Sequence, residues 1–197
     1  MPTRLVGQFK VTLQDVDPPV WRRIQVPANY TFWDLHVAIQ DAMGWHDSHL
    51  HSFKVRIRKG PSVVIGIPDE DYESGRETLP GWDIPLARYL TRNGQKAMYE
   101  YDFGDGWEHE LVFEGVVPLG PALQCPRCID GARACPPEDC GGPHGYARLL
   151  EALHDPNHPS RAELMDWVGG AFDPEAFHPS KVEFDDPEER WRIAFAE

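Results

Sequence analysis

A β-hairpin pattern runs through residues 97–116, AMYEYDFGDGWEHELVFEGV. Its second half alternates between two kinds of side chain: Trp107, His109, Leu111 and Phe113 share one parity, and Glu108, Glu110 and Glu114 share the other. Such alternation predicts a strand with one buried and one exposed face. The run Gly104-Asp105-Gly106 supplies the turn between the two strands. We therefore expect an antiparallel sheet whose buried face carries His109.

Three further strands are expected ahead of this hairpin. Residues 8–14 alternate in the same way and are followed, after the turn DVDPP at 15–19, by a second strand at 20–26. Residues 49–57 alternate again, with Phe53 on the apolar face. His49 and His51 have the parity of Phe53, so we expect both imidazoles on the inward face of this strand.

One helix is expected between these strands, at residues 32–43. Its apolar side chains recur at helical spacing, and Gly44 follows it as a stop signal. Thr31 and Asp34 stand three residues apart at its start, which is the spacing of a capping box.

The order strand, strand, helix, strand, strand, strand predicts an α+β fold. We expect an antiparallel or mixed sheet with one packed helix, resembling a β-grasp (ubiquitin-like) roll. Residues 59–83 are predicted as a long surface loop and residues 84–90 as a short helix. The predicted organisation is a sheet domain at 1–117 and a Cys-rich loop with helices at 118–197, packed together as one compact unit.

Three helices are expected in the C-terminal part, at 146–154, 162–168 and 187–195. Ser160 and Glu163 have capping-box spacing before the second of them. Asp186 and Pro187 are typical of a cap and first turn before the third.

The composition indicates which cellular compartment and which class of partner to expect. The net charge is −13, from 32 acidic and 19 basic residues, and no apolar run approaches the length of a membrane-spanning helix. No secretory signal pattern follows Met1, so the cytoplasm is the expected compartment. Because nucleic-acid affinity depends on cations that neutralise phosphates, this charge disfavours nucleic-acid binding and favours a protein partner. The sequence leaves the oligomeric state open.

All four cysteines lie in a short segment of the chain, as Cys125, Cys128, Cys135 and Cys140. Clustered cysteines in a cytosolic protein suggest metal binding, and a CxxC turn can present two thiolates to one ion. A structural zinc site is therefore the expected cofactor. Two alternatives stay open, namely unligated thiols packed in a loop and a redox-active CxxC.

The second cluster of candidate ligands is formed by histidines and carboxylates. If the strands that carry His51 and His109 are neighbours, these imidazoles and His49 would converge at one end of the sheet, beside Asp105. Such a group would suit either a catalytic metal with open positions or a His–Asp acid–base pair. Inward histidines are also common as hydrogen-bonded core residues. The further candidate binding residues are Asp102, Trp107, Glu138 and Asp139.

The chain resembles the plasmid pRiA ORF-three-like family, also found as the so-called TnpR passenger protein of some insertion elements. Five segments carry the resemblance, with x for positions that do not count: VWRRIxVP at 20–27, LHxxIQxAMGW at 35–45, HLHxF at 49–53, YDFGDxWxH at 101–109, and CxxG at 128–131 leading to PPEDxGGxxGY at 136–146. The resemblance covers about residues 5 to 180 and implies an α+β fold. It implies no established biochemical activity, and the acidic C-terminal part lacks the basic tail of a DNA recombinase.

Two functions follow from the two clusters. The first is a zinc-stabilised binding or adaptor module centred on the cysteines. The second is a metal-dependent or acid–base enzyme of hydrolase type, centred on His49, His51, Asp105 and His109.

Overall fold

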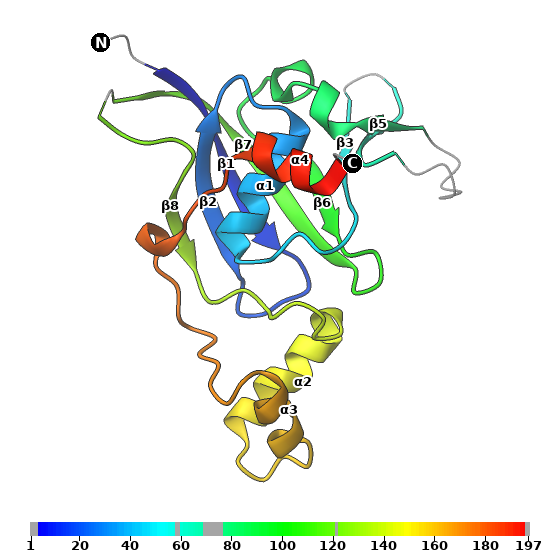
Figure 1. Ribbon diagram of the computed structural model, residues 1–197, viewed down its shortest axis with the longest axis vertical. Helices are drawn as coiled ribbons and strands as arrows, with labels where there is room; N and C mark the ends of the chain where they lie inside the picture. Colours follow the sequence, from blue (N-terminus) through cyan, green and yellow to red (C-terminus); the bar gives the residue numbers. More distant parts are fainter. Residues whose placement is uncertain (1–3, 58–59, 69–76, 121, 196–197) are drawn as a thin grey trace.

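A mixed β-sheet forms the centre of the computed structural model, which describes residues 4–57, 60–68, 77–120 and 122–195 (Figure 1). Its strands are β1 (Arg4–Leu13), β2 (Trp21–Pro27), β3 (His51–Val55), β4 (Val63–Gly66), β5 (Thr78–Pro80), β6 (Gln95–Tyr101), β7 (Trp107–Leu119) and β8 (Arg127–Ala132). In space they follow the order β5-β4-β3-β6-β7-β1-β2-β8. Neighbouring strands are antiparallel except β4 and β5, which run parallel. The expected α+β class is therefore confirmed.

The β-grasp detail is not confirmed. The first strand pairs antiparallel with both of its neighbours, β2 and β7, and the parallel pair β4–β5 lies at an edge of the sheet. The result is an open, mixed sheet with more strands than the predicted roll.

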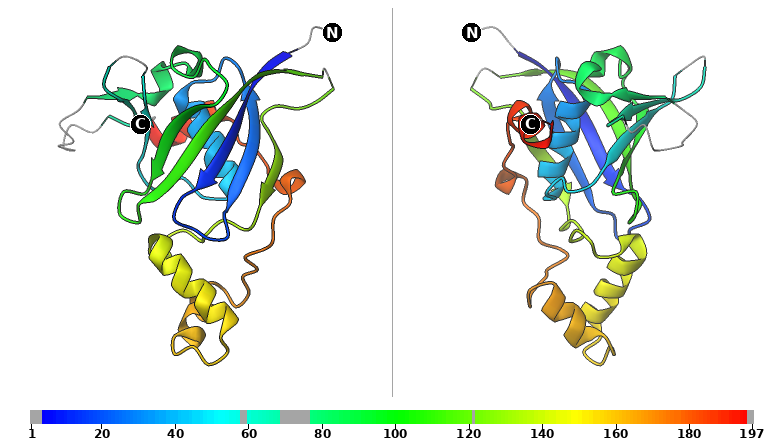
Figure 2. Two further views of the ribbon diagram at one scale, coloured as in Figure 1. Left: turned by 180° about the vertical axis from the view of Figure 1, so that it is seen from behind. Right: turned by 45° about the vertical axis from the view of Figure 1, so that its right-hand side comes forward.

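Helices lie on one face of the sheet and beyond one end of it. They are α1 (Phe32–Met43), α2 (Gly142–His154), α3 (Arg161–Trp167) and α4 (Pro187–Phe195), with 3-10 turns η1 (Gly81–Asp83), η2 (Leu86–Arg88) and η3 (Pro179–Lys181). Helix α1 covers the sheet, α4 crosses over α1, and α2 and α3 form a hairpin that extends away from the sheet (Figures 1 and 2). None of the described helices is both long and apolar enough to cross a membrane.

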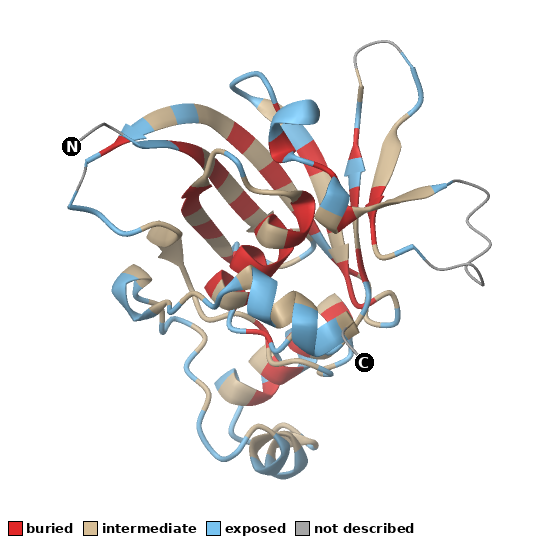
Figure 3. Cartoon of the chain, turned by 45° about the horizontal axis from the view of Figure 1, so that its top comes forward, coloured by how far each residue is buried: buried red, intermediate tan, exposed pale blue. Residues whose placement is uncertain are grey.

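The core fills the layer between α1 and the sheet. Buried positions alternate along the strands, which is visible as red bands along the strands in Figure 3. Phe9, Ile24, Phe53 and Tyr99 come from four different strands and are at most 1% exposed, and Leu35 meets them from α1. This common burial explains why strand parity in the sequence identifies the inward side chains.

The predicted capping box at the start of α1 is confirmed. The Asp34 backbone N–H donates to Thr31 Oγ1 at 3.2 Å, and the Thr31 N–H donates to Asp34 Oδ2 at 2.8 Å. Gly44 ends the helix with φ +87°, a left-handed conformation that glycine adopts without steric cost.

The second predicted capping box is wrong. Ser160 makes no capping hydrogen bond to α3, because its hydroxyl accepts instead from Arg148 Nη2 at 2.6 Å. The cap expected before the last helix is present, since the Glu188 N–H donates to Asp186 Oδ1 at 2.9 Å.

The two long segments expected to be loops contain strands. The described part of 59–83 holds β4 and β5, and the described part of 118–145 holds β8 and the start of α2; residues 59, 69–76 and 121 lie outside the described part. Thus residues 118–197 supply the last two residues of β7 and the whole of β8 to the sheet, and they return as α4 onto α1. Neither β4 nor β8 alternates between buried and exposed positions, so periodicity did not reveal them.

Candidate metal-binding site

Three loops meet at the end of the sheet where β3 begins and β6 ends. They are residues 47–50, the turn 102–106 between β6 and β7, and residues 138–141 before α2. The Asp102 N–H donates to the Leu50 carbonyl at 2.9 Å, which joins the first loop to the second. The Gly141 N–H donates to Asp105 Oδ2 at 3.1 Å, which joins the second to the third.

One imidazole and two carboxylates gather where these loops meet, and we call His49, Asp102 and Asp139 the rim cluster. His49 Nε2 lies 3.1 Å from Asp139 Oδ1 and 3.6 Å from Asp102 Oδ2. One potential ligand atom from each of the three residues falls within 4.8 Å of the others. The side chains are 31%, 12% and 71% exposed, in the order His49, Asp102, Asp139, so the cluster is open to solvent.

Backbone conformation helps to place both carboxylates. Asp102 has φ +53° and Asp139 has φ +57°, in the left-handed region that aspartate tolerates better than most residues. Asp102 Oδ1 accepts from the N–H groups of Gly104 at 3.0 Å and Asp105 at 3.3 Å. These bonds fix the carboxylate and leave Oδ2 directed toward His49.

Tyr101 connects the rim cluster to the core. Its hydroxyl donates to Glu138 Oε1 at 2.6 Å and accepts from the Ser48 N–H at 3.0 Å. Burial, and then the Glu138 carboxylate, raise the pKa of Tyr101, so the phenol stays protonated and continues to donate. This hydrogen bond fixes the carboxylate of Glu138, which directly precedes Asp139 in the chain.

A second group of potential ligands lies inside the protein and consists of His36, Asp47 and His51. His36 Nε2 lies 2.6 Å from Asp47 Oδ1, and His36 Nδ1 lies 2.8 Å from the Tyr99 hydroxyl. Both ring nitrogens of His51 are buried and have no hydrogen-bond partner among the described residues. Burial lowers the pKa of both histidines, more strongly for His51, so both rings are neutral near pH 7.

The stacking of these two rings argues against a shared metal ion. The His36 and His51 centroids are 3.5 Å apart and the ring planes differ by 7°. A ring nitrogen binds zinc at about 2.0–2.1 Å through a lone pair in its own plane. An ion in the plane of one ring would lie well outside the plane of the other. Of the two groups, the rim cluster is therefore the better metal site.

The predicted convergence of three histidines does not occur. Strand β6 separates β3 from β7, so His51 and His109 lie on opposite sides of Tyr99, with ring centroids 6.1 and 5.2 Å from it. His109 is fully buried and meets Trp45 edge-on at 5.3 Å. His49 is not inward, because β3 begins only at His51 and the parity of the strand does not extend to residue 49.

The remaining carboxylate and aromatic candidates divide between the rim and the core. Asp105 and Glu138 flank the rim cluster through the hydrogen bonds described above. Trp107 is 1% exposed and packs on Trp45 with centroids 5.8 Å apart, so it is a core residue. The sequence patterns did not identify His36 and Asp47 as candidates. The i, i+4 spacing of His36 and Gln40 could have indicated a shared polar contact on one face of α1, since both side chains contact the Tyr99 hydroxyl.

The four thiols occupy different surroundings. Cys125 Sγ donates to the Gln25 carbonyl at 3.4 Å, and Cys128 Sγ donates to the Asp130 carbonyl at 3.4 Å. All four cysteines are free, and in the described chain they form no set of three ligand atoms within 4.8 Å of one another. Burial raises the pKa of Cys125 to about 11 and of Cys140 to about 12, which keeps these thiols protonated near pH 7. Zinc binding by the four cysteines stays a prediction.

A buried arginine lies beside two of the thiols. Arg22 is 1% exposed, and it donates to the carbonyls of Ala42 at 2.7 Å, Trp21 at 2.9 Å and Ala132 at 3.0 Å. Burial lowers the pKa of Arg22, and its charge acts in turn to lower the pKa of the Cys128 and Cys135 thiols, against the rise that burial causes there. In the described structure Arg22 has no carboxylate partner.

Comparison with known proteins identifies the family. The model of the plasmid pRiA4b ORF-3-like protein family matches residues 6–181. The chain belongs to this family. It is 40% identical over 167 residues to the uncharacterized protein y4hQ of Sinorhizobium fredii (strain NBRC 101917 / NGR234), covering 84% of this chain and 82% of that protein. It also resembles the crystal structure of a protein of unknown function, MM3350, from Methanosarcina mazei Go1, with 38% identity, a TM-score of 0.83, and coverage of 93% of this chain and 100% of the other. The pRiA4b ORF-3-like fold is thus shared with a solved structure.

Proposed function

We propose that this pRiA4b ORF-3-like protein binds one divalent cation at the rim cluster and acts as a metal-dependent enzyme of hydrolase type. The observation that carries the proposal is the approach of His49 Nε2 to one carboxylate oxygen each from Asp102 and Asp139. An imidazole with two carboxylates is a donor set for borderline or hard divalent metals. Three protein ligands at a solvent-open site would leave positions for water and substrate.

Residues beside the rim cluster support a hydrolytic role. His49, Asp102 and Asp139 would hold the cation, which would supply a water of lowered pKa as a nucleophile near neutral pH. Glu138 is the candidate general base, since its Oε1 accepts from Tyr101 and its other carboxylate oxygen has no hydrogen-bond partner among the described residues. Asp105 is the candidate positioning residue, because it fixes the loop that carries Asp139 through Gly141.

Metal binding tests the proposal directly. Protein stripped with a chelator and dialysed against Mn²⁺ or Zn²⁺ should take up about one ion at this site, with affinity reduced at least tenfold by Asp102→Asn or His49→Ala. Asp166→Asn is the matched control, because Asp166 is an exposed carboxylate on α3. Equal affinity in wild type, control and both rim variants would contradict the assignment.

A second candidate function is the zinc-stabilised binding or adaptor module. The observation in its favour is Arg22, a buried cation that makes no ion pair with a carboxylate in the described chain and whose charge favours the thiolate forms of Cys128 and Cys135. Four thiolates around one Zn²⁺ carry an excess of negative charge, which this guanidinium would offset. Loss of one zinc equivalent in Cys128→Ser, with retention in His49→Ala, would support this candidate over the rim cluster.

A further inference from the structure

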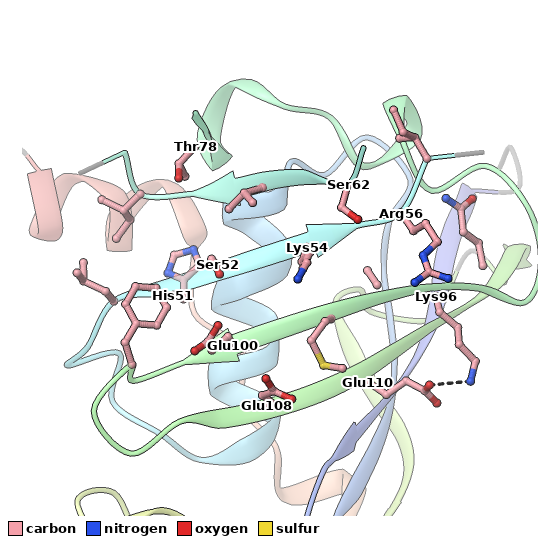
Figure 4. Close-up of a pocket in the computed structure, with 18 of the residues that line it drawn as sticks. His51, Ser52, Lys54, Arg56, Ser62, Thr78, Lys96, Glu100, Glu108 and Glu110 are labelled. Carbon is pink, nitrogen blue, oxygen red and sulfur yellow. Dashed lines mark hydrogen bonds and ion pairs between the residues drawn. The ribbon is translucent and has the colours of Figure 1, made fainter. Parts of the chain in front are cut away.

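The sheet face opposite α1 carries a groove that plays no part in the rim cluster. Strands β4, β3, β6 and β7 line it, and it encloses about 980 Å³ (Figure 4). Side chains of opposite parity to the core residues point into it, among them Lys54 and Glu100. Met98 lies directly across from Lys54 and gives the middle of the groove an apolar floor.

Charge is distributed unevenly along this groove. At the end near the rim, Glu100 and Glu108 are direct cross-strand partners of β6 and β7. At the other end Arg56 stands one position beyond the pair Val55–Ala97, which brings it opposite Lys96 on β6. The groove thus holds an acidic pair at one end and a basic pair at the other, as Figure 4 shows. Like charges placed opposite each other in a sheet are destabilising, so a ligand of opposite charge at each end would relieve this repulsion.

Most of these charges are not neutralised within the described chain. Lys96 is paired with Glu110 at 2.6 Å. In the residues for which side chains are described, Lys54, Arg56, Glu100 and Glu108 make no ion pair of their own. Burial, followed by the charge of Glu108, raises the pKa of Glu100, and the opposing charge of Lys54 only partly offsets this rise.

The distance between the acidic pair and the basic pair indicates how far apart the charges of a ligand must lie. Ser52 is the cross-strand partner of Glu100, and Arg56 lies four residues farther along the same chain direction. Four residues of strand span about 13 Å. In an extended peptide, side chains i, i+2 and i+4 share one face, and i and i+4 are separated by the same distance.

We propose that this groove binds an extended peptide segment of a protein partner that carries a basic residue and an acidic residue four positions apart. The basic side chain would lie at Glu100 and Glu108, and the acidic one at Arg56. An apolar side chain midway would rest on Met98, a residue type that adapts to varied partners. This proposal does not depend on metal at the rim cluster, and it agrees with the protein partner expected from the acidic composition.

Short blocked peptides and ¹⁵N-labelled protein provide the test, with EDTA present so that metal has no role. The probes are acetyl-Lys-Ala-Val-Ala-Asp-amide and the reversed acetyl-Asp-Ala-Val-Ala-Lys-amide, since either chain direction fits the charges. The composition-matched control is acetyl-Ala-Lys-Asp-Val-Ala-amide, in which the charges are adjacent. One of the two spaced peptides should shift backbone amide signals of β3 and β6 saturably, with at least tenfold higher affinity than the control.

A charge exchange makes the test specific. The double variant Glu100→Lys/Glu108→Lys should bind the spaced peptide at least tenfold more weakly and should instead prefer acetyl-Asp-Ala-Val-Ala-Asp-amide. The double variant Glu151→Lys/Glu163→Lys makes the same change in net charge on exposed positions of α2 and α3, and should behave as wild type. Absence of groove shifts with both spaced peptides, or equal affinity for the control peptide, would overturn the proposal. An unchanged preference in the Glu100→Lys/Glu108→Lys variant would do the same.

Discussion

Replacing His109 with glutamine should remove a loss of stability that the wild-type protein suffers as the pH falls below about 6.5. His109 is fully buried, and burial lowers its pKa from 6.5 to about 4, outweighing the opposing influence of the Tyr99 and Trp107 backbone. Within the described part of the chain, neither ring nitrogen makes a well-formed hydrogen bond. Glutamine has a comparable size and does not titrate in this range.

The sign and the magnitude follow from proton linkage. Between pH 6.5 and 4 the unfolded chain binds a proton at this histidine and the folded protein does not, so the free energy of unfolding falls with the pH. Each unit of pKa difference corresponds to about 1.36 kcal/mol, which gives a loss of about 3 kcal/mol across this window. Above pH 6.5 the contribution of this group is constant.

Urea unfolding at a series of pH values from 7.5 to 4 measures the effect. The difference in free energy of unfolding between wild type and His109→Gln should shift by about 3 kcal/mol in favour of the variant as the pH falls. His46→Gln is the control, because the His46 side chain is already exposed in the folded protein. A difference between wild type and His109→Gln that does not change with pH would refute the reasoning.

Three further substitutions test the fold and the site. Arg22→Met should lower the free energy of unfolding by roughly 3–5 kcal/mol, because three carbonyls including that of Ala42 lose a buried charged donor. Thermal unfolding should accordingly show a Tm lower by roughly 10 °C. Thr31→Ala should cost about 1 kcal/mol through loss of the α1 cap, and Thr31→Ser much less, as measured by urea unfolding. Gly142→Ala should destabilise the protein by about 1–3 kcal/mol and weaken Mn²⁺ binding in dialysis, because Gly142 has φ +68° and an added Cβ would lie 2.4 Å from the Asp105 carbonyl oxygen.

The sequence predicted those elements whose two faces meet different surroundings. Strand β7 alternates because one face packs on the core and the other meets solvent, and α1 has an apolar stripe for the same reason. Strand β8 has no such contrast, since five of its six residues are half-buried, and its place is fixed by backbone pairing with β2. Hydrogen bonds between backbones leave no side-chain pattern, so the sequence predicts a loop where this strand lies.

The candidate site was predictable in its residues and not in its grouping. Parity placed His51 and His109 on the buried face, but it carries no information on which strands are neighbours, and β6 lies between them. The rim cluster joins Asp139 to His49 across 90 positions of sequence. Such a contact depends on the path of the whole chain, which local spacing does not determine.

The return of α4 onto α1 bears on how the chain folds during synthesis. Trp33 lies against Phe195 with centroids 5.3 Å apart and donates from Nε1 to the Pro187 carbonyl at 2.9 Å. Trp82 lies 5.2 Å from the same Phe195 ring. At about 5–20 residues per second, the ribosome would leave both indoles without this cover for on the order of ten seconds. During that interval the nascent chain exposes an aromatic surface to which chaperones can bind.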